Sequence, residues 1–223
     1  MQISPQQRAA FRRLAADLPG IDRAAYAEYG RDPLEPILGL GEATARIALF
    51  GRDPGRDEVQ HGLPFIGAGG QKVRAALYEH RHGAPLPDFA ASLEIGRHYF
   101  WINTVPYKPV GNKAWSMKVK KAFQPLVAEL LLAWPGRDLI TLGREAFLWF
   151  AIQQPRETAE RLAAFWASPG RFETHCEVEL RRPEGGVRSF RLSPLPHPSP
   201  LNATWYRRFP ELLRARLRQL DDA

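Results

Sequence analysis

The segment LFGRDPGRDEVQHGLPFIG, from Leu49 to Gly67, contains an abrupt change from apolar to polar sequence. Its first residues complete the run ARIALF (45–50), which is short and continuously apolar, as is typical of a strand buried on both faces of a sheet. Gly51 ends this run, and Asp53 follows within a turn sequence that contains proline and glycine. The chain therefore leaves a predicted buried strand through a carboxylate.

Strand-like and helix-like patterns alternate along the rest of the chain. Ser4 and Pro5 predict the start of a helix over 4–18, because serine caps helices and proline fits their first position. Further strands are expected at 98–105 and 138–143, and the turn PEGG predicts a hairpin or sheet edge formed by 175–182 and 187–194. Further helices are expected over 69–81, over 116–134 with a start, kink or break at Pro125, from 144 onward, and over much of 203–220 with an interruption near Pro210.

This alternation predicts an α/β fold, a three-layer α/β/α sandwich around a short, mostly parallel central sheet. The chain has 223 residues, of which 44% are hydrophobic, and it contains no repeat, which fits a single domain over 1–223. Residues 1–44 are expected to form an N-terminal helical extension packed on that domain. The proline-rich stretches at Pro183 and 194–200 are then loops rather than interdomain linkers.

Several unusual residues are expected just past the strands of this sheet. They are Asp53 after 45–50, Asn103 near the end of 98–105, Gly143 at the end of 138–143, and His197 after the apolar-alternating run 187–195. Because ligands of such sheets bind at the carboxyl edge, an acid, an amide and an imidazole would converge there. That convergence favours a functional site more than any one of these residues does alone.

Each residue also has a purely structural interpretation. Asp53 fits ordinary Asp-Pro-Gly turn chemistry, and Phe65 fits a place in the core. Asn103 could cap a neighbouring loop, although a buried amide needs partners for both its oxygen and its NH₂ group. His197 lies between prolines and could make a structural hydrogen bond.

Basic residues follow the expected asparagine strand. No acid occurs between 104 and 121, a segment that contains Lys108, Lys113, Lys118, Lys120 and Lys121. A solvated helix face would explain these lysines, but their place beside the expected site favours contacts with phosphate groups. The whole chain has a net charge of +7 and a pI near 9.8, which is consistent with a polyanionic partner.

The loop HPSPLN (197–202) contains an apolar residue, Leu201, in polar and proline-stiffened surroundings. This leucine could fold into the core, or it could protrude and act as a wedge that opens a base stack. Arg207 and Arg208 add positive charge shortly after it.

Composition excludes several kinds of site. Cys176 is the only cysteine, so intrachain disulfides and cysteine-rich zinc or iron–sulfur sites are excluded. The six histidines include no HExxH pattern, and His80 and His82 fit a polar helix end, so no metal is expected. The nucleotide-binding motifs GxGxxG and GxxxxGK[ST] are absent. The N-terminal sequence has no apolar signal core and no run is long enough to span a bilayer, so a cytoplasmic location is expected.

Five motifs, in this order along the chain, resemble those of the uracil-DNA glycosylase superfamily. GRDPG resembles its first motif, HPSPLN its second, and INTV the asparagine strand between them. GLPFIGAGG is similar to the phenylalanine-containing stretch of the bacterial and archaeal family-4 branch, and LITLGREAF to the strand before the second motif. The resemblance covers roughly residues 46–217 and implies the three-layer fold and monofunctional base-excision chemistry without a cofactor.

The resemblance implies a role for individual residues. Asp53 would activate water and stabilise the cationic sugar, and His197 would hydrogen-bond the O2 atom of uracil. Phe65 would stack on the base, and Asn103 would read its edge. The backbone N–H groups of the turn that contains Arg52 and Gly55 would face the flipped base, while the predicted DNA contacts are Leu201 as the intercalating residue together with Ser199, Asn202, Lys108, Lys113 and Lys118.

The chain departs from the family patterns at three positions. Asp53 stands where family 4 usually has alanine, so the mechanism is expected to be closer to that of family 1. Gly55 stands where family 1 has a tyrosine that excludes the thymine methyl group, which leaves the acceptance of thymine open. Arg52 replaces an uncharged residue and could bind phosphate or pair with Asp57 or Glu58.

The leading hypothesis is a uracil-DNA glycosylase that flips uracil out of single- or double-stranded DNA and hydrolyses its N-glycosidic bond. It would leave an abasic site and so start base-excision repair, as a monomer acting at the nucleoid in a bacterial cytoplasm. One alternative is a mismatch glycosylase that acts on thymine or damaged bases opposite guanine. Another is a protein that binds uracil-containing DNA without cleaving it.

Overall fold

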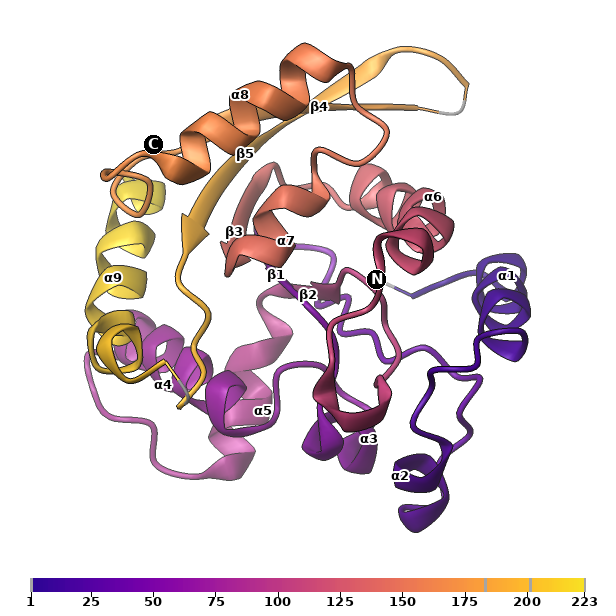
Figure 1. The fold of residues 1–223 in the computed structure, drawn as a ribbon. Coiled ribbons are helices and arrows are strands. Elements are labelled where there is room, and N and C mark those ends of the chain that lie inside the picture. Colours follow the sequence, from indigo (N-terminus) through magenta and orange to yellow (C-terminus); the bar gives the residue numbers. More distant parts are fainter. Residues whose placement is uncertain (1, 183, 201, 223) are drawn as a thin grey trace.

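The computed structural model describes residues 2–182, 184–200 and 202–222, and within them the chain forms one five-stranded sheet between two layers of helices (Figure 1). The strand order is β2–β1–β3–β5–β4. The strands are β1 (Ile47–Gly51), β2 (Phe100–Asn103), β3 (Asp138–Leu142), β4 (Cys176–Arg181) and β5 (Val187–Leu195). All neighbouring pairs are parallel except β4–β5, which is antiparallel. The predicted α/β fold with a mostly parallel sheet is confirmed.

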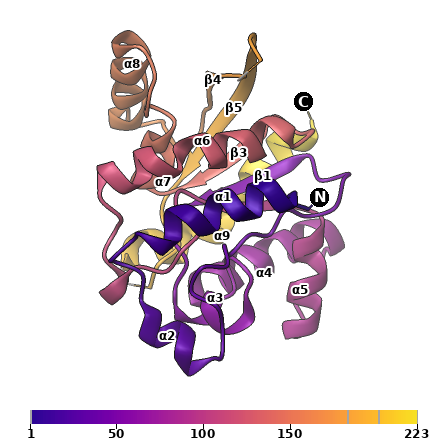
Figure 2. The same cartoon turned by 90° about the vertical axis from the view of Figure 1, so that its right-hand side faces the viewer.

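Helices cover both faces of the sheet. Against one face lie α1 (Pro5–Ala16), α6 (Met117–Ala133), α7 (Arg144–Trp149) and α8 (Arg156–Ala167). Against the other lie α4 (Ala68–His82), α5 (Phe89–Arg97) and α9 (Ala203–Asp221). Figure 2 shows α6 and α7 on one side of the strands and α4 and α5 on the other.

The residues of β1 explain why both faces are covered. Ala48 and Phe50 belong to the core cluster under α6 and α7, whereas Leu49, which points the opposite way, belongs to the cluster under α4 and α9. Side chains alternate between the two faces of a strand, so a continuously apolar run must be buried on both sides. The run 45–50 therefore specifies a central strand with helices above and below it.

The N-terminal segment contributes to the core. Ser4 caps α1 as predicted, and its side chain accepts a hydrogen bond from the backbone N–H of Gln7. Phe11 stacks against Phe123 of α6 with ring centroids 6.3 Å apart. The short helix α2 (Arg23–Glu28) follows, and its Tyr26 is also buried.

Two proline-based expectations are changed by the structure. The predicted interruption near Pro210 is wrong, since α9 runs from Ala203 to Asp221 without a break. Of the alternatives at Pro125, the start and the break are wrong, since α6 continues through this residue. A proline removes one backbone hydrogen bond from a helix. Phe209 and Leu213, both fully buried, anchor α9 to the sheet on either side of Pro210, and this packing outweighs the local penalty.

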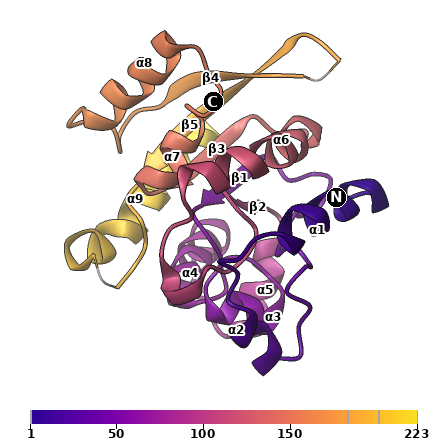
Figure 3. The same cartoon turned by 45° about the vertical axis from the view of Figure 1, so that its right-hand side comes forward.

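The hairpin of β4 and β5 was predicted correctly, and Figure 3 shows it projecting with α8 beside it. The strand expected over 98–105 is shorter, because β2 ends at Asn103 and the chain turns there. The helices α2, α5, α8, α3 (Arg56–His61) and the 3₁₀ turn η1 (Val110–Asn112) were not predicted. Among the described residues, no helix is both long and apolar enough to cross a membrane.

Candidate active site

The carboxyl ends of β1, β2, β3 and β5 meet at one edge of the sheet, where a cleft of about 530 Å³ opens. The segment after β1, the start of α4, the end of β2 and the loop after β5 form its walls. The predicted site residues that line it are Arg52, Asp53, Gly55, Phe65, Asn103, His197 and Ser199. The structure therefore brings together residues that are far apart in the sequence.

Gly51 lines this cleft. It ends β1 and pairs in register with Asn103 of β2. A side chain on Gly51 would place its Cβ atom 2.4 Å from the Phe65 ring and 3.5 Å from Nδ2 of Asn103. A side chain on residue 51 would therefore displace the Phe65 ring, whereas the distance to the Asn103 amide is an ordinary contact.

Phe65 enters the cleft from an unusual backbone conformation. Its φ angle is 56°, in the left-handed region that residues with a Cβ atom rarely adopt. The ring is only partly buried, and it packs against Trp101 with centroids 5.3 Å apart. Phe65 thus lines the cleft rather than filling the centre of the core.

Asn103 is buried with an unsatisfied acceptor. The residue is 3% exposed and lines the cleft. Within the described part of the chain, its Oδ1 atom has no hydrogen-bond partner. A buried amide oxygen without a partner is costly, so this atom is suited to accept a hydrogen bond from a ligand. The alternative in which Asn103 only caps a loop does not account for that atom.

The side chain of Asp53 is almost completely buried, with 1% exposed. Its Oδ1 atom accepts a hydrogen bond from Oγ1 of Thr104 at 3.4 Å, and its Oδ2 atom lies 3.0 Å from Nε of Arg52. Burial raises the pKa of Asp53 to about 6, although the positive charges of Arg52 and Lys120 act in the opposite direction. Such a carboxylate is ionised above neutral pH but poorly solvated, which suits a general base or a group that stabilises a cation.

The side chain of Arg52 takes neither of the two carboxylate partners considered from the sequence. It pairs with Asp53, and its Nη2 atom donates a hydrogen bond to the backbone oxygen of Asn112 at 2.9 Å. The proposed pairing with Asp57 or Glu58 is therefore wrong. Arg52 instead links the turn after β1 to Asn112 of η1, which also lines the cleft.

Thr104 and Glu58 hold the backbone of the site, and sequence reasoning did not identify either. The Thr104 N–H group donates to the backbone oxygens of Gly51 and Arg52, at 2.9 and 3.0 Å. Glu58 accepts hydrogen bonds from the N–H groups of Gly55, Ile66 and Gly67, each at 2.9 Å. Two sequence features could have indicated these residues: Thr104 directly follows Asn103, and Glu58 lies three residues after a predicted turn.

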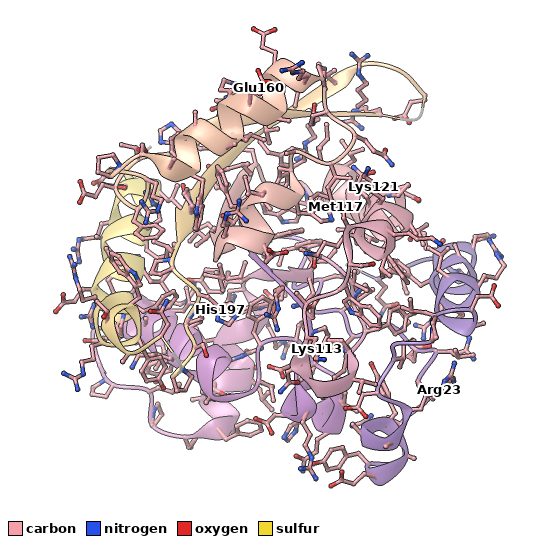
Figure 4. All side chains as sticks on the ribbon, viewed as in Figure 1. Arg23, Lys113, Met117, Lys121, Glu160 and His197 are labelled. Carbon is pink, nitrogen blue, oxygen red and sulfur yellow. The ribbon has the colours of Figure 1, made fainter. Side chains whose placement is uncertain are left out.

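His197 lies on the loop that leaves β5, as Figure 4 shows. A Cβ atom on Gly143, whose φ angle is 91°, would lie 3.0 Å from Cβ of His197, so the end of β3 passes close to this loop. Part of His197 meets solvent, but the surrounding protein desolvates the ring. This desolvation, and then the positive charge of Arg52, lowers the pKa of His197 below its ordinary value. The imidazole is therefore neutral at pH 7 and can donate a hydrogen bond from one ring nitrogen.

The second-motif loop forms a turn beside the start of α4. The Ser199 N–H group donates to the oxygen of His197, and the Asn202 N–H group donates to the oxygen of Ser199, both at 2.9 Å. Asn202 is the residue before α9. The predicted intercalating residue, Leu201, lies outside the described residues.

The predicted phosphate-binding lysines fall into two groups. Lys108 is 4% exposed, and its Nζ atom pairs with Asp22 at 2.8 Å, so its expected role as a DNA contact is corrected to a structural one. Lys120 is buried as well and pairs with Glu145. Lys113, Lys118 and Lys121 are exposed, and Lys113, labelled in Figure 4, directly follows η1. Of the lysines between 104 and 121, only these three are exposed to solvent.

A model of the uracil DNA glycosylase superfamily matches residues 38–221, which include every described residue that lines the cleft. The chain belongs to this superfamily. Membership implies DNA glycosylase activity on damaged bases, with DNA as the substrate. A comparison with curated proteins gave no significant match.

The iron–sulfur cluster of the family-4 glycosylases does not fit this member of the superfamily. Such a cluster needs four cysteine ligands, and Cys176 is the only cysteine in the sequence. Among the residues that the structure describes, no group of three or more histidine, cysteine, aspartate or glutamate side chains is arranged to hold a metal ion.

Proposed function

We propose that the chain is a uracil-DNA glycosylase, which binds a uracil base flipped out of DNA and hydrolyses its N-glycosidic bond. The product would be free uracil and an abasic site, the first step of base-excision repair. Gly51, at the end of β1, and the loop 197–200 line the same cleft, in which a flipped base could lie while the rest of the DNA remains outside.

The unpartnered amide oxygen of Asn103 carries this proposal. Uracil presents an N3–H donor between two carbonyl oxygens, so its N3–H could donate to Oδ1 while its O4 atom accepts from Nδ2. Cytosine presents an acceptor and an amino group at the same two positions. Each buried group left unpaired costs about 1–3 kcal/mol, so the amide favours uracil over cytosine.

The charges around the cleft match those of the bond-breaking step. Cleavage of an N-glycosidic bond develops positive charge on the sugar and negative charge on the leaving base. The carboxylate of Asp53 would stabilise the sugar cation and orient the attacking water, while the neutral ring of His197 would donate a hydrogen bond to O2 of the base. One preorganised donor of this kind contributes roughly 2.7–4 kcal/mol to transition-state stabilisation.

Phe65 and the surface lysines would support binding. The partly exposed ring of Phe65 offers a face on which the flipped base can stack. Lys113, Lys118 and Lys121 are exposed, and their charges would contact phosphate groups along the strand. These contacts would offset the few kcal/mol needed to remove a base from the stack.

A second candidate, a mismatch glycosylase that accepts thymine, is favoured by one observation. No side chain projects from Gly55 into the cleft, and the carboxylate of Glu58 occupies that position, with Oε2 2.8 Å from where a Cβ atom of residue 55 would lie. The site therefore lacks an aromatic wall at Gly55, and the room for a methyl group depends on Glu58.

Single-turnover cleavage of end-labelled oligonucleotides in EDTA separates these functions. The set contains uracil in a single strand, U·A, U·G, T·G and C·G, and strand breaks are read after alkali treatment. The proposal predicts breaks at uracil and none at cytosine. Equal cleavage of T·G would favour the mismatch function, and binding of uracil DNA without any cleavage would contradict both.

A further inference from the structure

A buried arginine outside the cleft lining holds the segment that carries Phe65. We propose that Arg74 of α4 is a positioning residue for the base-stacking ring, because its guanidinium binds the backbone oxygens that fix Phe65 in its left-handed conformation. This inference rests on the proposed function, in which Phe65 stacks on the flipped base. Arg74 does not contact the base itself and does not line the cleft.

The guanidinium of Arg74 is bound entirely to backbone oxygens. Nε donates to the oxygen of Phe65 at 2.8 Å, Nη2 to that of Pro64 at 3.2 Å, and Nη1 to that of Ser92 at 2.6 Å. The residue is 3% exposed. Burial lowers the pKa of Arg74 to about 10, although the negative charge of Glu58 acts in the opposite direction. Burying a charge costs free energy, and three backbone oxygens offset part of that cost here by accepting hydrogen bonds from the guanidinium.

The carbonyl groups of Pro64 and Phe65, which precede and follow the Cα atom of Phe65, therefore both bind one planar guanidinium group. A φ angle of 56° is strained for phenylalanine and persists only where the surroundings fix it. On the other side of the segment, Glu58 binds the N–H groups of Ile66 and Gly67. Arg74 and Glu58 thus hold the same short segment by its acceptors and by its donors.

Aromatic packing connects Arg74 to the ring as well as to the backbone. The guanidinium carbon lies 4.6 Å from the centroid of the Trp101 ring, and Trp101 in turn packs against Phe65. The Trp101 indole donates a hydrogen bond to the oxygen of Gly96 at 2.7 Å, which fixes its orientation. A displacement of Arg74 would therefore release both the carbonyl groups of the segment and the ring that supports Phe65.

An arginine is required for this arrangement. The three acceptors come from two different segments, and only a planar group with several N–H donors can reach all of them at once. A lysine at position 74 keeps the charge but presents a single nitrogen. We therefore expect Arg74→Lys to behave as a defective variant rather than as a conservative one.

Arg216 of α9 offers a matched control. It is also 3% exposed, its pKa is also lowered to about 10 by burial, and its Nη2 atom donates to the backbone oxygens of Phe172 and Thr174. It does not line the cleft. Arg216→Met removes a similar buried charge and similar carbonyl contacts without touching the Phe65 segment.

The experiment compares Arg74→Met, Arg74→Lys and Arg216→Met with the wild-type chain. Thermal melts establish that each variant is folded, and Arg74→Lys serves if Arg74→Met does not fold. Hydrogen exchange of the Ile66 and Gly67 amides reports the segment directly, without reference to activity. Inhibition by free uracil and the pH dependence of single-turnover cleavage report the site.

We expect both Arg74 variants to raise exchange at residues 66 and 67 at least tenfold and to weaken uracil inhibition at least tenfold. The cleavage rate should still fall at the same acid pH as in the wild type, because this fall reports protonation of Asp53, which Arg74 does not bind. Unchanged exchange and unchanged inhibition would overturn the inference, as would equal losses in Arg216→Met. If the wild-type chain neither cleaves uracil DNA nor binds uracil, the proposed function fails, while the exchange data still decide whether Arg74 holds the segment.

Discussion

Arg52 and Asp53 are neighbours in sequence whose side chains also pair, with Nε of Arg52 3.0 Å from Oδ2 of Asp53. The carboxylate is almost completely buried, whereas about a third of the Arg52 side chain is exposed. One charge thus lies inside the cleft wall, and its counterion lies at the rim. This pairing keeps a desolvated carboxylate ionised near neutral pH while leaving one of its oxygens free of strong hydrogen bonds.

Replacement of Asp53 with asparagine should abolish most turnover and spare binding. Asparagine keeps the shape of the side chain but can neither accept a proton from water nor stabilise a cation by its charge. A positioned acid–base group typically contributes about 10²–10⁴-fold to rate, so we expect at least a 100-fold loss in the single-turnover rate. Gel-shift affinity for uracil DNA should change less than about threefold. A full rate in Asp53→Asn would show that this carboxylate does not activate water.

The same substitution should raise stability in alkaline buffer. The folded chain raises the pKa of Asp53 from 3.8 to about 6, so it binds this proton more tightly than the unfolded chain does. The stability that this group contributes is complete below pH 3.8 and is lost as the pH rises through about 6. At pH 8 the ionised carboxylate lowers the free energy of unfolding by about 1–3 kcal/mol, a penalty that asparagine removes. Denaturant melts should therefore show a stabilised variant at pH 8 and no gain at pH 4.

The pH dependence of cleavage should report Asp53 and its pairing with Arg52. The wild-type rate should fall below about pH 6, as the carboxyl group takes up a proton. In Arg52→Gln the largest opposing charge is gone, so the pKa of Asp53 should rise further and the acid limb should move up by about one pH unit. Single-turnover rates between pH 5 and 9 measure the fall in rate at acid pH for both the wild type and Arg52→Gln. A limb that stays in place in the variant would show that Arg52 does not tune this carboxyl group.

The exposed and the buried lysines should respond differently to mutation. Lys113→Ala and Lys118→Ala should each weaken DNA binding and reduce the slope of log affinity against log salt concentration by about 1. Lys108→Met should leave that slope unchanged and lower the free energy of unfolding by about 1–3 kcal/mol, because it removes the hydrogen-bonded ion pair of a buried lysine with Asp22. Fluorescence-anisotropy titrations at several salt concentrations, together with denaturant melts, test both statements. A reduced salt slope in Lys108→Met would contradict the structural role of this lysine.

The convergence of Asp53, Asn103 and His197 could be predicted because each follows a recognisable strand, and parallel strands share a carboxyl edge. The role of Lys108 could not, because its partner Asp22 lies 86 residues earlier in the chain. A run of lysines looks the same in sequence whether its members meet solvent or a buried acid. Charge patterning alone therefore overestimated the basic surface beside the cleft.

The residues that bind the backbone of the site could not be predicted from the sequence for a related reason. Glu58 and Arg74 bind backbone groups, which every residue type carries, so the sequence does not indicate which residues they bind. The short helix α3, which carries Glu58, has six residues, too few for an apolar period to be read. The continuity of α9 through Pro210 likewise depends on packing against the sheet, which a local proline rule does not include.

The most direct test of the account is the mass of a uracil-containing oligonucleotide after incubation with the chain in EDTA, with free bases separated by chromatography. The account predicts that the oligonucleotide loses the mass of one base, that free uracil appears in equal amount, and that Asp53→Asn binds the same DNA without releasing uracil. An oligonucleotide that keeps its full mass while bound to the wild-type chain would contradict it and would establish a protein that recognises uracil without excising it.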